Sequence, residues 1–123
     1  MKKFLAGVIV GVLASTLAVL AAQNSNSKTV KPQVLTDNAK VEIVRWVLKP
    51  GERTPMHRHD IDHIGVVVHG STIRYVDADG TSTTSEEPTG GAEYAPATHK
   101  AHWFENVGKT PFEAVSIHLK SGK

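Results

Sequence analysis

Hydrophobic and polar residues alternate with a period of two along most of the chain from Val34 onward. The stretch VEIVRWVLK at 41–49 is rich in β-branched residues and ends at the turn-forming pair Pro50-Gly51. Further strands are predicted within 63–70, on both sides of Asp79-Gly80, within 90–96 and on both sides of 107–111. No ten-residue stretch has helical periodicity, so these short strands predict an all-β barrel or sandwich.

The N-terminus has a different pattern, which is typical of an export segment. Lys2 and Lys3 precede nineteen uncharged, mainly apolar residues at 4–22, and small residues near the end offer a cleavage site. A run of this length is also close to the roughly 20 residues that span a bilayer, so an uncleaved anchor is the alternative. In both cases the folded part is expected outside the cytoplasm, either periplasmic or secreted, or anchored to the inner membrane.

These patterns divide the chain into three parts. Residues 1–22 are predicted to be a signal peptide or membrane-anchor helix, and residues 23–33, QNSNSKTVKPQ, a polar linker. Residues 34–120 are predicted to form one small barrel domain, which is as much as a chain of 123 residues can supply.

Charge and cysteine content exclude several classes of function. Without Lys2 and Lys3, twelve basic residues balance twelve acidic ones, so the domain has no electrostatic reason to bind nucleic acid. A membrane is expected as a partner only through the N-terminal segment. The chain contains no cysteine, which excludes disulfides, thiolate metal ligands and a cysteine nucleophile.

The stretch PMHRHDIDH at 55–63 carries the most distinctive chemistry in the chain. Its three histidines, His57, His59 and His63, have the same parity, so on an extended chain their side chains point to one face. His69 has the same parity, whereas Val66 and Val68 would face a second sheet or a partner subunit. Two more histidines, His99 and His102, occur in PATHKAHWFEN. Neutral imidazoles gathered from distant strands inside a barrel suit a divalent transition metal.

Two sets of residues resemble the motifs of the cupin superfamily. The first set has the spacing G-x5-H-x-H-x3-H-x6-G and comprises Gly51, His57, His59, His63 and Gly70, with histidine where glutamate usually stands. The second set comprises Gly90, Pro96, His102 and Asn106. It departs from the pattern at Thr98, which replaces a glycine, and by one extra residue before His102. The resemblance covers about residues 34–120 and is closest to small single-domain bacterial cupins.

The resemblance implies a cupin-type double-stranded β-helix barrel, here preceded by the hydrophobic N-terminal helix. It also implies a metal site whose ligands would be His57, His59, His63 and His102; a hydrogen-bonding role is the alternative for His63. Because histidine replaces glutamate, the ligand set would be neutral and would favour Fe, Mn, Ni, Cu or Zn over Mg²⁺ or Ca²⁺.

Other residues receive structural or supporting interpretations. His99 is expected in an exposed turn, His69 and His118 on strands as hydrogen-bonding residues, and Trp46 and Trp103 as packing anchors. Five further residues are expected in the core, near the pocket or at its mouth: Phe104, Asn106, Arg53, Tyr75 and Tyr94.

Three functions are compatible with these features. The first is a divalent-metal-dependent enzyme, dioxygenase-like, acting on a small organic substrate. The second is a non-catalytic module that binds a metal or a small ligand. The third is a structural barrel with a vestigial site that forms a homodimer.

Overall fold

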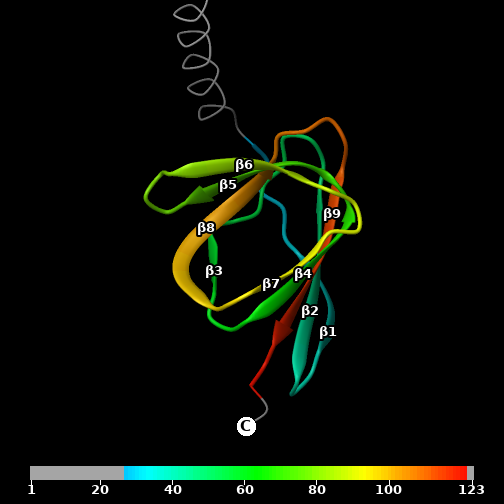
Figure 1. The fold of residues 1–123 in the computed structure, drawn as a ribbon, viewed down its shortest axis with the longest axis vertical. Helices are drawn as coiled ribbons and strands as arrows, with labels where there is room; N and C mark the ends of the chain where they lie inside the picture. The colour runs from blue at the N-terminus through cyan, green and yellow to red at the C-terminus, as the bar shows by residue number, and fades with distance from the viewer. Residues whose placement is uncertain (1–26, 122–123) are drawn as a thin grey trace, which may run out of the picture.

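The computed structural model describes residues 27–121, which form nine strands and no helix (Figure 1). The strands are β1 (Gln33–Asp37), β2 (Val41–Leu48), β3 (His57–His59), β4 (His63–His69), β5 (Ser71–Asp77), β6 (Ser82–Glu87), β7 (Ala92–Ala95), β8 (Thr98–Asn106) and β9 (Phe112–Leu119). Within this range no helix is long and apolar enough to cross a membrane. The predicted export segment at 1–22 lies outside the described residues.

The strands form two antiparallel sheets that face each other across the barrel interior (Figure 1). The larger sheet has the order β1-β2-β9-β4-β7, and the smaller sheet has the order β3-β8-β5-β6. The prediction of an all-β fold is confirmed, as are the strands predicted on either side of the turn pairs. Because β2 and β9 pair along their whole length, sequence-distant segments lie side by side in the larger sheet.

The described residues begin before the first strand. Thr29 forms a bridge with Arg53, and Val30 packs against the hydrophobic core. Backbone hydrogen bonds join Lys28 and Val30 to Arg53, each with a donor–acceptor distance of 2.9 Å. The last residues of the predicted linker therefore lie against the barrel, at the end where β2 leads into β3.

Two of the motif glycines have a backbone reason for being glycine. Gly51 has a φ of 86°, a left-handed conformation that L-residues with a side chain rarely adopt. Gly70 lies so close to the backbone of 87–89 that an added Cβ would be 2.2 Å from the carbonyl oxygen of Glu87. Both glycines therefore belong to the turns that close the barrel at this end.

Alternation along the strands separates an inner from an outer face in each sheet. On β2, Val44, Trp46 and Leu48 are buried, whereas Val47 is 39% exposed. Leu48 packs with Ile73 of β5 and Phe112 of β9, which joins the two sheets through one apolar cluster. Burial of this cluster is the main source of stability at the closed end of the barrel.

Asn106 is a fully buried polar residue at this closed end. Its amide nitrogen donates to the carbonyl oxygens of Leu48 (2.9 Å) and Thr110 (2.7 Å). Its amide oxygen accepts from the hydroxyl of Ser71 (2.8 Å) and the backbone nitrogen of Gly108 (3.0 Å). One side chain thus connects the end of β2, the start of β5 and the β8–β9 turn.

We predict that Asn106→Ala lowers the free energy of unfolding by at least about 3 kcal/mol, because several buried polar groups lose their partner. Chemical denaturation with unchanged m-value would measure this loss. Asn38→Ala is the matched control: its side chain also accepts two backbone hydrogen bonds, but in an exposed turn. The control should cost about 1 kcal/mol or less. Equal losses in the two variants would contradict the role assigned to Asn106.

Candidate metal centre

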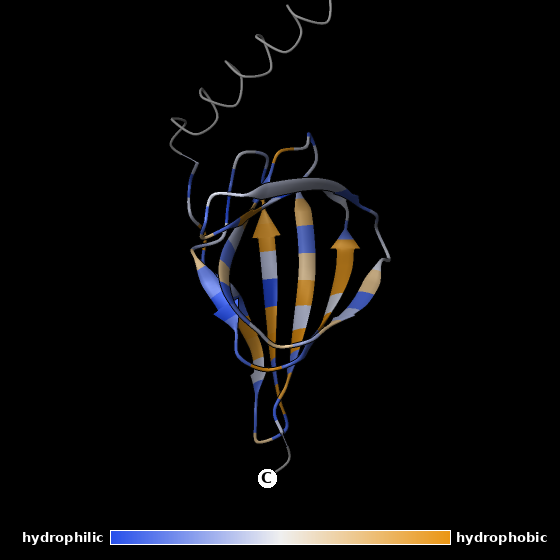
Figure 2. Cartoon of the chain, turned by 60° about the vertical axis from the view of Figure 1, so that its left-hand side comes forward, coloured by the Kyte–Doolittle hydropathy of each residue, from blue (hydrophilic) through white to orange (hydrophobic). Residues whose placement is uncertain are grey.

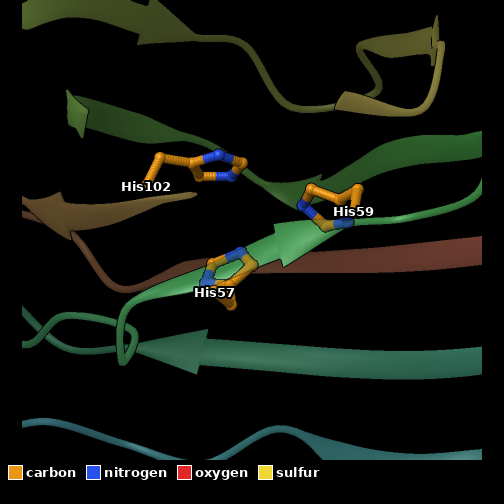
Figure 3. Close-up of side chains that lie close together, drawn as sticks. All are labelled: His57, His59 and His102. Atoms are coloured by element: carbon orange, nitrogen blue, oxygen red, sulfur yellow. The ribbon is translucent and has the colours of Figure 1, made fainter. Parts of the chain in front are cut away.

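Three histidines from two strands meet inside the barrel (Figure 3). Strand β3 supplies His57 and His59, and β8 supplies His102, which lies directly opposite His57 in the antiparallel register. One ring nitrogen of each lies within 4.8 Å of the others. The ring centroid of His57 is 4.6 Å from that of His102 and 5.0 Å from that of His59. The structure therefore gathers three of the four predicted ligands.

A register shift in β8 explains which histidine of the second motif joins the group. His57 pairs with His102, but His59 pairs with Thr98, so three residues of β8 oppose only Arg58. This bulge absorbs the extra residue of the motif, as β-bulges commonly do. It also carries His99, whose side chain is 89% exposed. His99 lies on the strand rather than in a turn, and it points away from the group.

Local contacts leave one nitrogen of His57 free to bind a ligand. Its Nδ1 lies 2.8 Å from the carbonyl oxygen of Pro55. Because a carbonyl only accepts, Nδ1 carries the proton and Nε2 carries a lone pair. That Nε2 atom is buried and has no hydrogen-bond partner among the described residues. The ring also stacks on Trp46, with 5.8 Å between centroids, which fixes its orientation.

Burial favours the neutral form of His57 and His59. Desolvation is the main cause that lowers the pKa of His57, and repulsion by His102 and His118 adds to it. Desolvation, reinforced by His63 and His57, lowers the pKa of His59 to about 3. A neutral imidazole is the form that binds a metal. The orphaned Nε2 of His57, the neutral rings and their spacing fit a divalent transition metal.

His63 lies beside this group. Its ring stacks on that of His59, with 4.0 Å between centroids and 24° between planes. Burial lowers the pKa of His63 as well, and its Nδ1 atom is buried without a partner in the described part of the chain. Its nitrogens lie outside the three-histidine group, so ligation by His63 stays a prediction.

His118 is a fifth histidine of the cluster, for which the sequence predicted a structural hydrogen bond and no place at the site. It lies on β9 opposite His63, with ring centroids 5.7 Å from His63 and 5.6 Å from His59. Its Nδ1 lies 3.1 Å from a carboxylate oxygen of Glu42, which orients the ring. The expected structural hydrogen bond is therefore present. His118 has the same parity as Phe112 on β9, which indicates that its side chain points inward. Only the pairing of β9 with β4 places it beside His63.

The histidines open into a cavity of about 300 Å³ inside the barrel. Its walls are largely aromatic, with Trp46, Tyr75, Phe104 and Phe112 beside the imidazoles. Phe104 thus lines the cavity as well as packing against the core, whereas Asn106 does not reach it. Such a partly apolar cavity with a few convergent polar groups is typical of a small-molecule site.

Several other candidates lie away from the cavity. His69 is exposed, because the register of β4 shifts between Val67 and His69, and its Nδ1 donates to the carbonyl oxygen of Pro111 at 2.7 Å. Arg53 stacks on Trp103 with 4.7 Å from its guanidinium carbon to the ring centroid, and Arg53 does not line the cavity. Both residues therefore have structural contacts.

Tyr94 and Asp62 connect the two loops at the cavity mouth. The hydroxyl of Tyr94 donates to Asp62, and the backbone nitrogen of Ala97 donates to the same carboxylate at 2.8 Å. These two hydrogen bonds lower the pKa of Asp62. The β3–β4 loop is thus held against the segment that joins β7 to β8.

Solved structures with a similar fold include cupins. A cupin domain from Bordetella pertussis is 28% identical, with a TM-score of 0.72 over 80% of this chain and 100% of that chain. An RmlC-like cupin family protein from Methanocaldococcus jannaschii, described as a double-stranded β-helix, has a TM-score of 0.60 at 18% identity, over 79% and 85% of the chains. A double-stranded β-helix protein from Klebsiella pneumoniae has a TM-score of 0.59 at 23% identity, over 78% and 80%.

A comparison of the sequence with family models agrees with the structural similarity. No curated protein matches the chain. The model of a protein family, described as auxin binding protein, matches residues 20–102, which is more than half of the chain. The expected cupin-type double-stranded β-helix is confirmed, and the chain belongs to the auxin binding protein family within the cupin superfamily.

Proposed function

We propose that the protein is an exported metal-binding cupin that acts as a metal-dependent enzyme on a small organic substrate. His57, His59 and His102 would hold a divalent transition metal, namely Fe, Mn, Ni, Cu or Zn. The observation that carries the proposal is the convergence of three imidazoles at the wall of an aromatic-lined cavity. Catalytic metal sites commonly combine three protein ligands with an open position of this kind.

The bound metal would supply Lewis acidity toward a substrate or water in its open positions. The residues of the chain would orient both partners. Pro55 fixes the tautomer of His57, Trp46 fixes its ring plane, and Phe104 supplies apolar wall. Dioxygenation of a small molecule is the first activity to assay, followed by isomerisation and hydrolysis.

The position of His63 favours an enzyme over a closed binding module. A shell of four histidines around a tetrahedral metal would leave no position for a substrate. Here the ring of His63 lies flat on His59, and its nitrogens are outside the group of three. We therefore propose that His57, His59 and His102 suffice to hold the metal and that His63 borders the open side.

The first prediction concerns metal content. The full chain, expressed with its own N-terminal segment and purified without an affinity tag, should carry about one transition-metal ion per molecule. His57→Ala combined with His59→Ala should remove it, because one imidazole cannot retain the ion, while the fold survives. Plasma mass spectrometry measures the metal, and circular dichroism monitors the fold.

His99→Ala is the matched control, since His99 is on the same strand as His102 but exposed. It should keep the metal, and so should His63→Ala. Loss of metal in His63→Ala would indicate a four-histidine shell and favour the binding module. Unchanged metal in the double variant would refute the ligand assignment.

The second prediction concerns pH and the metal-free protein. Burial lowers the folded-state pKa values of His57, His59 and His63 below the ordinary value of about 6.5. Between that value and the lowered ones, the unfolded chain binds more protons than the folded chain. The contribution of these histidines to the free energy of unfolding is therefore complete above about pH 6.5. It is lost as the pH falls toward the lowered pKa values.

Calorimetric melting of the metal-free protein should thus show a steady decrease in Tm from pH 7 to pH 5. His59→Gln should make the decrease shallower, and His99→Gln should leave it unchanged. An equally steep decrease of Tm in His59→Gln would show that His59 does not contribute to the pH dependence of stability.

A second feature supports the homodimer. The outer face of the larger sheet is apolar across four strands, where an antiparallel sheet with a solvent-facing side is normally polar. One row of directly opposed residues across β2, β9, β4 and β7 comprises Ile43, Ile117, Ile64 and Tyr94. Figure 2 shows hydrophobic residues along the central strands of the larger sheet, at inward and outward positions together. We propose that a second copy of the chain covers this face.

The charges on this face favour self-association over a charged partner. Arg45 and Glu113 pair with each other at 2.6 Å, so the face carries no net charge from them. A neutral apolar surface can pack on its own copy about a twofold axis. Light scattering after size exclusion should give the mass of a dimer.

Val47→Lys combined with Val68→Lys should give a monomer, because these side chains are 39% and 45% exposed on the outer face and two lysines per copy would repel the partner. Thr84→Lys is the control, since Thr84 is exposed on the other sheet. A dimer that persists in the first variant would place the contact elsewhere.

A further inference from the structure

Two short connections join the smaller sheet to the larger sheet at the same corner of the barrel (Figure 1). The β3–β4 connection comprises residues 60–62, and the β7–β8 connection comprises residues 96–97. They run side by side, because His59 pairs with Thr98 at one end and His63 pairs with Ala95 at the other. Between these pairs, no backbone hydrogen bond of the described chain joins one connection to the other.

Asp62 supplies the contact that the backbone does not. Its carboxylate accepts hydrogen bonds from the hydroxyl of Tyr94 and, at 2.8 Å, from the backbone nitrogen of Ala97. Its own carbonyl oxygen accepts from the backbone nitrogen of Leu119, also at 2.8 Å. One residue of the β3–β4 connection is therefore bonded to β7, to the β7–β8 connection and to β9.

This contact matters for the candidate metal centre because His59 is the last residue of an edge strand. Strand β3 has three residues and pairs only with β8. Its start is held separately, since the backbone nitrogen of Thr54 donates to Phe104 at 2.9 Å and the hydroxyl of Thr54 accepts from Phe104 at 3.1 Å. Its far end, which carries His59, continues directly into the connection that Asp62 holds.

The other side-chain contact of this connection is weak by comparison. Arg58 and Asp60 form an ion pair at 3.0 Å, but their side chains are 58% and 59% exposed. Ion pairs in such positions contribute little, because water screens the charges and two long side chains must be ordered. Asp62 is therefore the main side-chain constraint on the chain between His59 and His63.

The same hydrogen bonds hold one wall of the histidine cavity. Ala95, Pro96 and Thr98 line the cavity, and Ala97 between them donates to Asp62. Strand β7, which leads into this wall, has only four residues and pairs only with β4. A short edge strand with few buried contacts opens more readily than the centre of a sheet. The wall would thus move away from the cavity if the contact with Asp62 were lost.

We propose that Asp62 is a positioning residue for the candidate metal centre, which holds His59 in place and keeps residues 95–98 closed over the cavity. Removal of its carboxylate would let the two connections separate, while His57 and His102 remain paired. A metal ion would still enter the site but would leave it faster. This inference rests on the proposed function insofar as the three-histidine group holds the metal.

The rate of metal release tests the proposal. Protein loaded with Co²⁺, a spectroscopic probe of divalent-metal sites, is mixed with excess chelator, and the loss of its absorption bands is followed. Asp62→Ala should release the ion at least about tenfold faster than the unaltered protein, which is the scale on which residues behind metal ligands act. Tyr94→Phe, which removes one of the two donors to the carboxylate, should have a smaller effect in the same direction.

Conservative and matched variants separate positioning from a general loss of structure. Asp62→Asn should restore slow release in part, because its amide oxygen can still accept from Ala97. Asp60→Ala is the control, since Asp60 is an aspartate of the same connection whose carboxylate pairs with exposed Arg58. It should leave the release rate unchanged. Unchanged release in Asp62→Ala would overturn the proposal, and so would equal acceleration in Asp60→Ala.

A measurement on metal-free protein distinguishes this inference from the proposed function. Trp46 lines the cavity and is 7% exposed, and Trp103 is the only other tryptophan of the chain. With Trp103→Phe as the background, quenching of Trp46 fluorescence by acrylamide reports access to the cavity. Asp62→Ala should raise the quenching constant at least about twofold, because local opening exposes a side chain that the closed barrel buries.

The two measurements together leave each idea open to refutation by itself. If the unaltered protein takes up no metal, the proposed function fails, and the closing role of Asp62 is then judged by quenching alone. A quenching constant that is the same in Asp62→Ala and Asp60→Ala would overturn that role. Melting temperatures are measured first, and if Asp62→Ala does not fold, Tyr94→Phe and Asp62→Asn provide the same comparisons.

Discussion

The antiparallel pairing of β3 with β8 is the constraint on which the site depends. Strand β3 has only three residues, and two of them are candidate ligands, so a slip of one residue would turn both imidazoles to the opposite face. The bulge opposite Arg58 allows the strand to carry extra residues while His102 remains opposite His57. The hydrogen bonds of Asn106 hold the far end of β8 against β2 and the β8–β9 turn. The geometry of the three-histidine group is therefore set from both ends of one strand.

The interior of the barrel combines groups that are costly to charge. Five histidines lie close together, and burial lowers the pKa values of three of them, His57, His59 and His63. Among the described residues that line the cavity, the only formally charged side chains are carboxylates. Nitrogen donors beside an acidic rim are electrostatically suited to a positive ion. The arginines support the outer surface instead.

The larger sheet has apolar residues on both faces, and the two faces have different roles. The inner face supplies Trp46, Leu48 and Phe112 to the cavity and the core. The outer face exposes Val47 and Val68 and also carries the Arg45–Glu113 ion pair. Because successive side chains on a strand point to opposite faces, the same strands can carry apolar residues on the inner and the outer face. The smaller sheet, in contrast, has the polar strand β6 at its edge, where Ser82, Thr83 and Thr84 are exposed.

Local sequence determined the strands, their turns and the histidine pairs, because alternation and turn-forming residues act over a few positions. It therefore placed His57 and His59 on one face, and the resemblance to the second cupin motif favoured His102 over His99. It could not place His118 beside His63, turn His69 outward at a bulge or assign Asn106 to a buried network, since each depends on which strands pair and in what register. Likewise Asp77 and Glu93 are ordinary acids in the sequence. Only the closed barrel, which brings β5 and β7 to the same cavity, makes them part of one site.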